Sequence, residues 1–394
     1  MLHFSRLKTV LILAVTALGI LFALPNLLPP SVLQALPHWL ASSRVTLGLD
    51  LQGGSHILLE VDGAALRKER AEQVRDDVRR VLREQRIGYT GLAIRDVTVQ
   101  LRLRDPAETQ KALTELRTLS TPVTNALLGG ATGEMTLNVA STSEGAISVT
   151  LTEAGLNARI RSAVDQSIEI IRRRIDQLGT VEPNIQRQGA DRILVQVPGL
   201  QDPQRLKSLL GQTAKLSFRM VDQSMSAQQA LDGRAPPDSE VLQAPDGTPY
   251  LIEKQVRVSG EDLTDAQPGF DTNSGQPIVT FRFNSNGARR FAVTTQEAVG
   301  RPFAIVLDNQ VISAPVIREP ITGGSGQISG NFTVQQANDL AILLRAGALP
   351  APLKVVEERT VGPSLGQDSI EAGKVAAFIA AGLVAVFMIA IYGL

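Results

Sequence analysis

One short segment of the sequence has a pattern that is typical of hydrolytic chemistry. It reads G-x-S-x-G and consists of Gly362, Pro363, Ser364, Leu365 and Gly366. In hydrolases with this pattern the serine lies on a sharp strand-to-helix turn, and a histidine further along the chain acts as its base. No histidine follows His56, so we interpret the segment as a tight turn that leads a strand into a helix.

Three other features suggest chemistry only weakly. The glycine run Gly323–Gly326 is followed by no Lys-Ser/Thr pair, so it is interpreted as a flexible hairpin loop rather than a phosphate-binding loop. The run Arg172–Arg174 is interpreted as a solvated face near a helix end, where cations are favourable. Cysteine is absent, and His3, His38 and His56 lack the spacing of metal ligands. We therefore predict no catalytic residue, no cofactor and no metal site.

Balanced charge and few aromatic residues exclude further classes of protein. The 394 residues contain 39 Lys and Arg against 39 Asp and Glu, which gives no net attraction to nucleic acid. Aromatic residues make up 4% of the chain, too few for a platform that stacks bases or sugars. The length suits two or three domains, and we expect no nucleic-acid partner.

The two ends of the chain are apolar enough to lie in a membrane. Residues 9–28 and 375–394 contain no charged side chain, and about 20 apolar residues suffice for a spanning helix. A cleaved signal peptide is the alternative for the first run, but no small-x-small cleavage site follows it. Arg6 and Lys8 place the N-terminus in the cytoplasm by the positive-inside rule, so the segment between the two runs is expected to be exported.

The second apolar run has no Lys or Arg after it. A natural cytoplasmic end usually carries such residues, so we expect the sequence to belong to a longer polytopic protein. Apart from Tyr392, neither run contains an ionisable residue, and these two spans alone are not expected to relay protons.

The elements of the exported part predict an antiparallel sheet with two helices on one face. A strand is predicted around His56–Val61, and apolar residues recur every three or four positions from Leu156 to Leu178, which indicates a helix. The next predicted elements are strands Val181–Arg187 and Arg192–Val197, a helix Pro203–Leu210 and a strand Ala214–Val221. This order is that of a ferredoxin-like βαββαβ domain, which we call the base, and Leu353–Val361 could add one more strand.

Two further segments interrupt this base. The insertion at 62–153 is predicted to hold a charged helix, Ala64–Arg86, and a loop-rich stretch around Gly129–Gly133. A second α+β unit, which we call the head, follows at 222–352. Its predicted elements are a strand Ile278–Phe283, a helix Ala288–Val299, a hairpin of Phe303–Leu307 and Val311–Ile317 across Asp308-Asn309, and a helix Val334–Arg345 capped by Thr333 and stopped by Gly347.

Four short motifs follow one another along the chain. They are Asp50-Leu51-Gln52-Gly53-Gly54, then Leu178-Gly179-Thr180-Val181-Glu182-Pro183 with Gly199-Leu200, then Ala304–Asp308 with Ala314–Ile317, and last Gly362–Gly366. In this order they resemble the SecD family of the bacterial Sec protein-translocation machinery. The insertion at 62–153 matches no motif and suggests one of the longer versions of the family.

The resemblance implies a multi-pass subunit of the bacterial inner membrane with a large periplasmic domain. Members of the family are similar to resistance-nodulation-division transporters, and they pair with SecF. Their periplasmic base and mobile head are thought to hold emerging unfolded secretory polypeptides, with proton flow driving head movement. The implied partners are therefore SecF, the SecYEG translocon, YajC and, functionally, SecA. Residues 50–54 and 362–366 would couple membrane and base structurally.

The predicted division of the chain combines these inferences. It is a cytoplasmic N-terminus at 1–8, a first transmembrane helix at 9–28, a periplasmic linker at 29–43, the base at 44–221 with its insertion at 62–153, the head at 222–352, a base strand and membrane junction at 353–373, and a second transmembrane helix at 374–394.

Two alternatives to a translocation subunit remain open at this point. One is a small-molecule efflux protein of the resistance-nodulation-division type, although an apolar binding pocket would have to be built with a single Trp and 11 Phe. The other is a membrane-anchored periplasmic hydrolase that uses Ser364. The residues of the head that would bind a polypeptide are not identified by the sequence.

Overall fold

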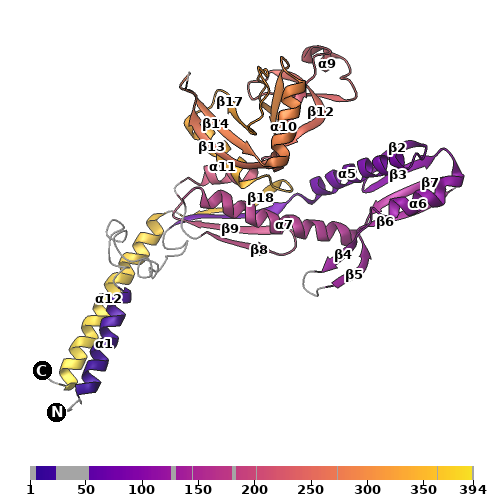
Figure 1. Ribbon diagram of the computed structural model, residues 1–394. Coiled ribbons are helices and arrows are strands. Elements are labelled where there is room, and N and C mark those ends of the chain that lie inside the picture. The colour runs from indigo at the N-terminus through magenta and orange to yellow at the C-terminus, as the bar shows by residue number, and fades with distance from the viewer. Residues whose placement is uncertain are drawn as a thin grey trace. The chain divides into compact units, whose positions relative to one another are not determined.

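The structure, a computed structural model, is mixed α+β, as the sequence predicts (Figure 1). It describes residues 6–23, 53–125, 130–143, 145–179, 183–200, 202–272, 274–361 and 363–392. The chain divides into two compact units. One consists of Met1–Gly54 with Val361–Leu394, and the other of Ser55–Thr360.

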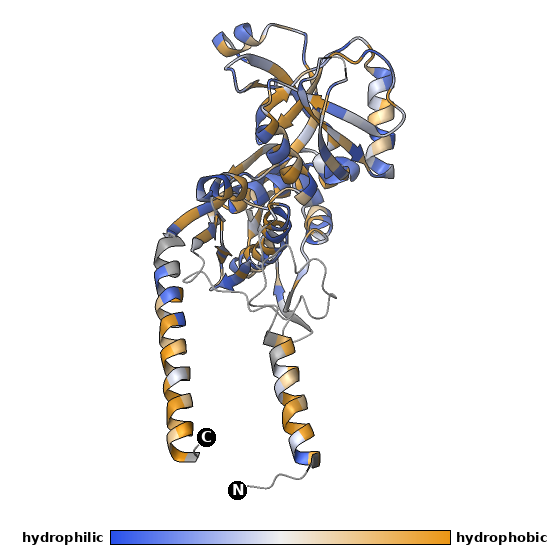
Figure 2. Ribbon diagram, turned by 90° about the vertical axis from the view of Figure 1, so that its left-hand side faces the viewer, coloured by the Kyte–Doolittle hydropathy of each residue, from blue (hydrophilic) through white to orange (hydrophobic). Residues whose placement is uncertain are grey.

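The first unit holds the two helices α1, Arg6–Ala23, and α12, Pro363–Tyr392. Figure 2 shows the apolar colour along α1 and along the C-terminal part of α12, whose first turns are hydrophilic. Within the described residues, Asp368–Ile391 is the one segment long and apolar enough to cross a membrane, with a mean hydropathy of 2.4. Leu7–Gly19 is apolar but shorter, and residues 24–28 of the predicted first span lie outside the described residues.

The base sheet has the strand order β18-β1-β9-β8. Its elements are β1 Gly54–Val61, β8 Asn184–Gln188, β9 Arg192–Pro198 and β18 Leu353–Val361, with helices α7 Glu153–Asp176 and α8 Pro203–Gly211. Alternate residues of β9 and one stripe of α7 meet in a single apolar core, which includes Ile193, Val195 and Ile171. α8 begins at Pro203 as predicted, and α7 begins at Glu153, three residues before the predicted stripe. Thr152 and Asp202 accept hydrogen bonds from the first-turn N–H groups of these helices.

The prediction of the last base strand was wrong. Leu216–Val221, now β10, pairs with β15 and with β12 in the head, and β18 occupies the edge of the base sheet. The strand itself was predicted correctly, and its residues Leu216, Phe218 and Met220 are buried in alternation with less buried residues. Alternation identifies a strand and its buried face, but it does not identify the sheet to which the strand belongs.

The insertion folds around its own core. Its elements are α5 Gly63–Glu84, β2 Tyr89–Arg95, β3 Thr98–Leu103, a short 3₁₀ helix Pro106–Glu108, α6 Thr109–Arg117, β4 Pro122–Asn125, β5 Gly130–Met135, β6 Leu137–Ser143 and β7 Ala146–Leu151. The charged helix was predicted correctly, whereas the stretch predicted as loop-rich contains β5 and leads into the four-stranded sheet β2-β3-β7-β6. Both α5 and α7 contribute to this core and to that of the base, through Leu66 and Val74 on α5 and through Leu156 and Val164 on α7.

The head combines a closed barrel with a three-stranded sheet. Its elements are β10 Leu216–Val221, α9 Ala227–Asp232, β11 Ser239–Gln243, β12 Pro249–Ser259, a 3₁₀ helix Gly260–Asp262, β13 Leu263–Phe270, β14 Pro277–Phe283, α10 Ser285–Glu297, β15 Phe303–Leu307, β16 Gln310–Ser313, β17 Ser325–Ser329 and α11 Val334–Ala346. The barrel order is β10-β12-β11-β16-β15, and the sheet order is β13-β14-β17. The Asp308-Asn309 turn and the ends of α11 are as predicted, with a capping box at Thr333.

Two details of the head differ from the prediction. The second strand of the predicted hairpin ends at Ser313 instead of Ile317. The glycine run is not a flexible loop, because Ser325–Ser329 pairs with β14 along its whole length. Gly326 is required there by packing, since a Cβ atom at this position would lie 2.6 Å from the Phe281 ring.

A glycine-to-alanine pair tests the contact between α7 and the insertion. At Gly155 a Cβ atom would lie 2.7 Å from the Thr136 carbonyl oxygen, so Gly155→Ala is expected to destabilise the protein by about 1–3 kcal/mol. Gly211, at the end of α8, has no atom within 4 Å of an added Cβ, and Gly211→Ala is the matched control. Urea unfolding of the full chain in detergent, followed by protease resistance, measures both. Equal stability of the two variants would contradict this packing.

Candidate functional site: a groove in the head and the junction beneath it

The head contains a groove of about 1070 Å³ between its barrel and its three-stranded sheet. One wall is the polar face of the sheet, where Gln267, Thr280 and Gln327 lie side by side on β13, β14 and β17. The opposite wall is the segment from Pro315 to Glu319, which follows the barrel strand β16. The groove is partly open to solvent and is large enough for several side chains of a bound chain.

The floor of the groove is aromatic. Phe218, Phe281, Phe291 and Phe303 line it, and Phe283 completes the cluster behind them. The rings are in mutual contact, with the centroid of Phe218 5.3 Å from that of Phe281 and 5.9 Å from that of Phe303. These distances are typical of tilted and offset aromatic pairs, so the floor is rigid. The residues come from β10, β14, α10 and β15.

Charges of both signs surround the groove. Asp265, Asp271 and Glu319 line it together with Arg282 and Arg318. Such a rim does not select a strongly acidic or strongly basic ligand. The site combines an apolar floor, polar walls and mixed charge, and it contains no cluster of metal-ligand type within the described residues.

A buried arginine lies at the junction of base and head. Arg174 on α7 has no exposed surface, so the prediction of a solvated Arg172–Arg174 face was wrong for this residue and right for its two neighbours. Its Nη1 donates to the carbonyl oxygens of Leu209 and Gln212, each at 2.6 Å. Its Nη2 donates to those of Thr213 at 3.4 Å and Gly347 at 3.2 Å.

Three of these four carbonyls belong to the two chain crossings between base and head, and that of Leu209 lies near the end of α8. The chain passes from α8 into β10 through residues 212–215, and it returns from α11 to β18 through residues 347–352. One guanidinium group therefore holds the outgoing and the returning segment together. Burial lowers the pKa of Arg174 to about 10, and the Asp308 carboxylate acts in the opposite direction, so the side chain is charged at neutral pH.

Asp308 ties the outgoing segment to the barrel. Its carboxylate accepts hydrogen bonds from the N–H groups of Ala214 at 2.9 Å and Lys215 at 2.8 Å, and from the hydroxyl of Thr213. Asp308 itself lies in the turn between β15 and β16, with a φ of 48°. The first strand of the head is thus anchored at its start.

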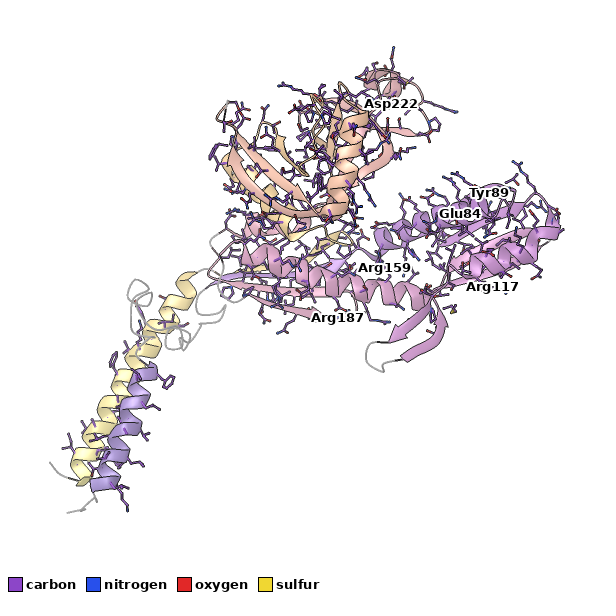
Figure 3. All side chains as sticks on the ribbon, in the orientation of Figure 1. Glu84, Tyr89, Arg117, Arg159, Arg187 and Asp222 are labelled. Atoms are coloured by element: carbon purple, nitrogen blue, oxygen red, sulfur yellow. The ribbon has the colours of Figure 1, made fainter. Side chains whose placement is uncertain are left out.

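Asp222, the predicted first residue of the head, lies inside it rather than at the crossing. Its N–H donates to the carbonyl oxygen of Leu251, and its carboxylate accepts from the hydroxyl of Ser239 at 2.6 Å and the N–H of Ser224 at 2.9 Å. Figure 3 shows Asp222 among the side chains of the head. The hydroxyl of Ser239 is the largest cause of a lowered pKa of this carboxyl.

The predicted coupling residues fall in the first compact unit. Asp50, Leu51, Gln52 and Gly362 lie outside the described residues. Gly53 and Gly54 enter β1 with φ values of 71° and 138°, which favour glycine. Pro363, Ser364, Leu365 and Gly366 form the first turn of α12, directly after β18 ends at Val361. The interpretation of residues 362–366 as a tight turn stays a prediction, because Gly362 lies outside the described residues.

Comparisons with known proteins identify the family of the chain. It is 42% identical to the protein translocase subunit SecD of Rickettsia bellii and 44% identical to that of Acetobacter pasteurianus, and each comparison covers 100% of this chain and 73% of the relative. The chain belongs to the SecD family. Family models match in three places: the SecD/SecF GG motif at 39–65, the N-terminal part of the SecDF P1 domain at 164–223, and the SecDF P1 head subdomain at 239–351.

Solved structures of SecDF are also similar to this SecD-family chain. The crystal structure of SecDF in its super-membrane-facing form is 28% identical, with a TM-score of 0.49 over 98% of this chain. This chain spans 39% of the length of that protein. A second SecDF structure, described as a membrane component that enhances protein export, is 37% identical over 50% of this chain, with a TM-score of 0.42.

The buried arginine can be tested against its exposed neighbour. Arg174→Leu leaves the carbonyls of Leu209, Gln212, Thr213 and Gly347 without their donor, and we expect a loss on the order of 3 kcal/mol in the free energy of unfolding. Arg173→Leu, on the exposed face of α7, is expected to change it by less than about 0.5 kcal/mol. Urea unfolding of both full-length variants gives the comparison. An Arg174→Leu protein as stable as Arg173→Leu would rule out the structural role.

The lowered pKa of Asp222 predicts that this residue contributes to the pH dependence of the free energy of unfolding. Because its pKa is lower in the folded protein, it stabilises the fold above its ordinary pKa, and this contribution disappears as the pH falls through the folded value. Asp222→Asn removes a titrating group. Below about pH 4, the stability of the Asp222→Asn protein should therefore depend less on pH than the stability of the unsubstituted protein. Denaturant midpoints measured from neutral to acid pH test this. Parallel curves for the two proteins would contradict it.

Proposed function

We propose that this chain is an accessory subunit of the bacterial Sec translocase whose head binds unfolded segments of secretory polypeptides. Membership of the SecD family supports the translocation role. The observation that carries the binding role is the groove in the head, with its phenylalanine floor and its rim of both charges. Each apolar side chain that leaves water in such a groove contributes up to about 1.5–3 kcal/mol, so several of them together would hold an unfolded segment transiently.

The groove suits ligands of many sequences. Above the almost fully buried phenylalanines, the exposed side chains of Pro315 and Val316 offer apolar surface to a hydrophobic side chain. Asp265, Glu319, Arg282 and Arg318 tolerate either charge at the rim. A small-molecule efflux pocket would instead enclose most of the surface of its ligand, and this groove is partly open to solvent. A translocation subunit, which receives many different polypeptides, requires this kind of weak and general binding.

The architecture suggests how binding could be linked to the membrane. We infer that α1 and α12 are two spanning helices, and that the base is ferredoxin-like, with the element order β1, α7, β8, β9, α8 and β18. The domain limits remain the predicted ones, except that residues 212–215 are the better start of the head because they contain the crossing. Asp50–Gly54 and Gly362–Gly366 would transmit movement between the spans and the base.

The remaining parts of the proposal concern energy and partners. Proton flow would drive the head together with SecF, after the steps of SecA and SecYEG, and YajC would belong to the same assembly. The relay residues would lie in segments other than the two apolar helices. The chain would act without catalysing a covalent reaction, so that Ser364 serves as part of the helix start.

Cysteine crosslinking tests the binding role, since the chain has no cysteine of its own. Val316 lines the groove and is 54% exposed, and Val293 on α10 is 53% exposed but is not a lining residue. We expect Val316→Cys in the full-length protein to form several-fold more disulfide with a single-cysteine secretory polypeptide arrested during export than Val293→Cys does. Similar yields at both positions would mean that the groove is not the binding site.

A further inference from the structure

The three-stranded sheet of the head has one open edge, and this edge borders the groove. β17 pairs with β14 on one side only, and Ser325, Gly326 and Gln327 line the groove. The opposite edge of the sheet is covered. Both Nε and Nη2 of Arg345 on α11 donate to the carbonyl oxygen of Ala266 on β13, at 3.0 and 2.6 Å.

The register shows which backbone groups of β17 are unpaired. The N–H of Phe283 donates to the carbonyl oxygen of Gly324. These two residues lie directly opposite each other when the pairing of Arg282 with Ser325 is continued by one residue. In an antiparallel pair, hydrogen-bonded and non-hydrogen-bonded positions alternate. The N–H and C=O groups of Ser325, Gln327 and Ser329 therefore point away from β14. No hydrogen bond among the described residues reaches these groups.

This edge lacks the usual devices that prevent strand pairing. Soluble proteins protect exposed edges with charged side chains, proline or bulges. β17 has the sequence SGQIS, which contains neither a charge nor a proline, and its pairing with β14 has no register shift. Outward-facing groups recur about 6.8 Å apart along such a strand, a spacing that another extended backbone matches.

We propose that an extended segment of an unfolded polypeptide binds in the groove as a fourth strand, paired with β17. The inference rests on the proposed function and adds the mode of recognition: the outward N–H and C=O groups of Ser325, Gln327 and Ser329 bind the main chain of the polypeptide, whatever its sequence. Alternate side chains of the added strand then face the phenylalanine floor, and the others lie beside Gln327 and Thr280 on the polar face.

A proline substitution removes one of these backbone donors. Because the N–H of Gln327 points away from β14, Gln327→Pro leaves the pairing of the sheet intact, as proline at an edge strand does. Gln327→Ala is the matched control, since it removes the side chain and keeps the N–H. In full-length protein that also carries Val316→Cys, we expect crosslinking to the arrested polypeptide to be about tenfold lower for Gln327→Pro than for Gln327→Ala.

A second measurement does not depend on the proline variant being folded. Gln327→Cys in the otherwise unchanged chain is combined with a series of polypeptides whose single cysteine moves by one residue at a time. Strand pairing predicts a yield that alternates with a period of two residues, because successive side chains of an added strand lie on opposite faces.

The outcomes separate this inference from the proposed function. If the crosslinking yield does not alternate and Gln327→Pro does not reduce crosslinking, polypeptides bind in the groove without strand pairing. This result would overturn the strand-pairing inference but not the proposed function. Absence of crosslinks from both Val316→Cys and Gln327→Cys would overturn the proposed function as well. Alternation together with a loss in Gln327→Pro supports strand addition.

Discussion

The arrangement of base and head depends on one buried guanidinium group. Removing the charge of Arg174 from water is costly, and its hydrogen bonds to four carbonyls compensate for this only when both chain crossings are in place. The crossings at 212–215 and 347–352 are thereby fixed to α7, the long helix that also reaches the core of the insertion. A displacement of the head would have to break or replace these bonds, so the junction favours discrete positions over continuous drift. The barrel, the groove and the α11 helix that covers β13 are all built on the segments that Arg174 holds.

Much of the local structure could be predicted from sequence, because caps and periodicity act locally. α7 and α11 follow their apolar stripes, and Thr333 and Gly347 mark the two ends of α11. Sheet membership could not be predicted in the same way, since Leu216–Val221 and Leu353–Val361 both alternate and each could complete the base. The sequence does contain a sign that Arg174 is buried. Arg174 lies three residues after Ile171 and four before Leu178, on the buried stripe of the helix, whereas Arg172 and Arg173 lie off this stripe. An arginine in register with an apolar stripe indicates a buried charge with specific partners.

The groove could not be predicted from the sequence, for a different reason. Its phenylalanines come from four elements separated by as many as 85 positions, and only Phe281 and Phe283 show a local pattern, as alternate residues of one strand. The low overall aromatic content gave no sign that the fold gathers 5 of its 11 phenylalanines into one buried cluster. The family resemblance predicted only that the head as a whole would hold a polypeptide. The residues that form the floor, including Phe218 before the predicted start of the head, follow only from tertiary packing.

A protein that handles many secretory polypeptides has to recognise what they share. Side chains differ from one polypeptide to the next, whereas the backbone N–H and C=O groups are common to all, and an unfolded segment leaves them available for pairing. Within the head, the barrel is closed, so that each of its strands β10, β11, β12, β15 and β16 has a neighbour on both sides. Arg345 and α11 cover the outer edge of β13. The open edge of β17 is thus placed beside the groove, where a bound segment would find both unpaired backbone groups and apolar side chains. Pairing with a single edge strand is also weak, because it lacks the second neighbour that a central strand has, and weak binding allows a polypeptide in transit to be released.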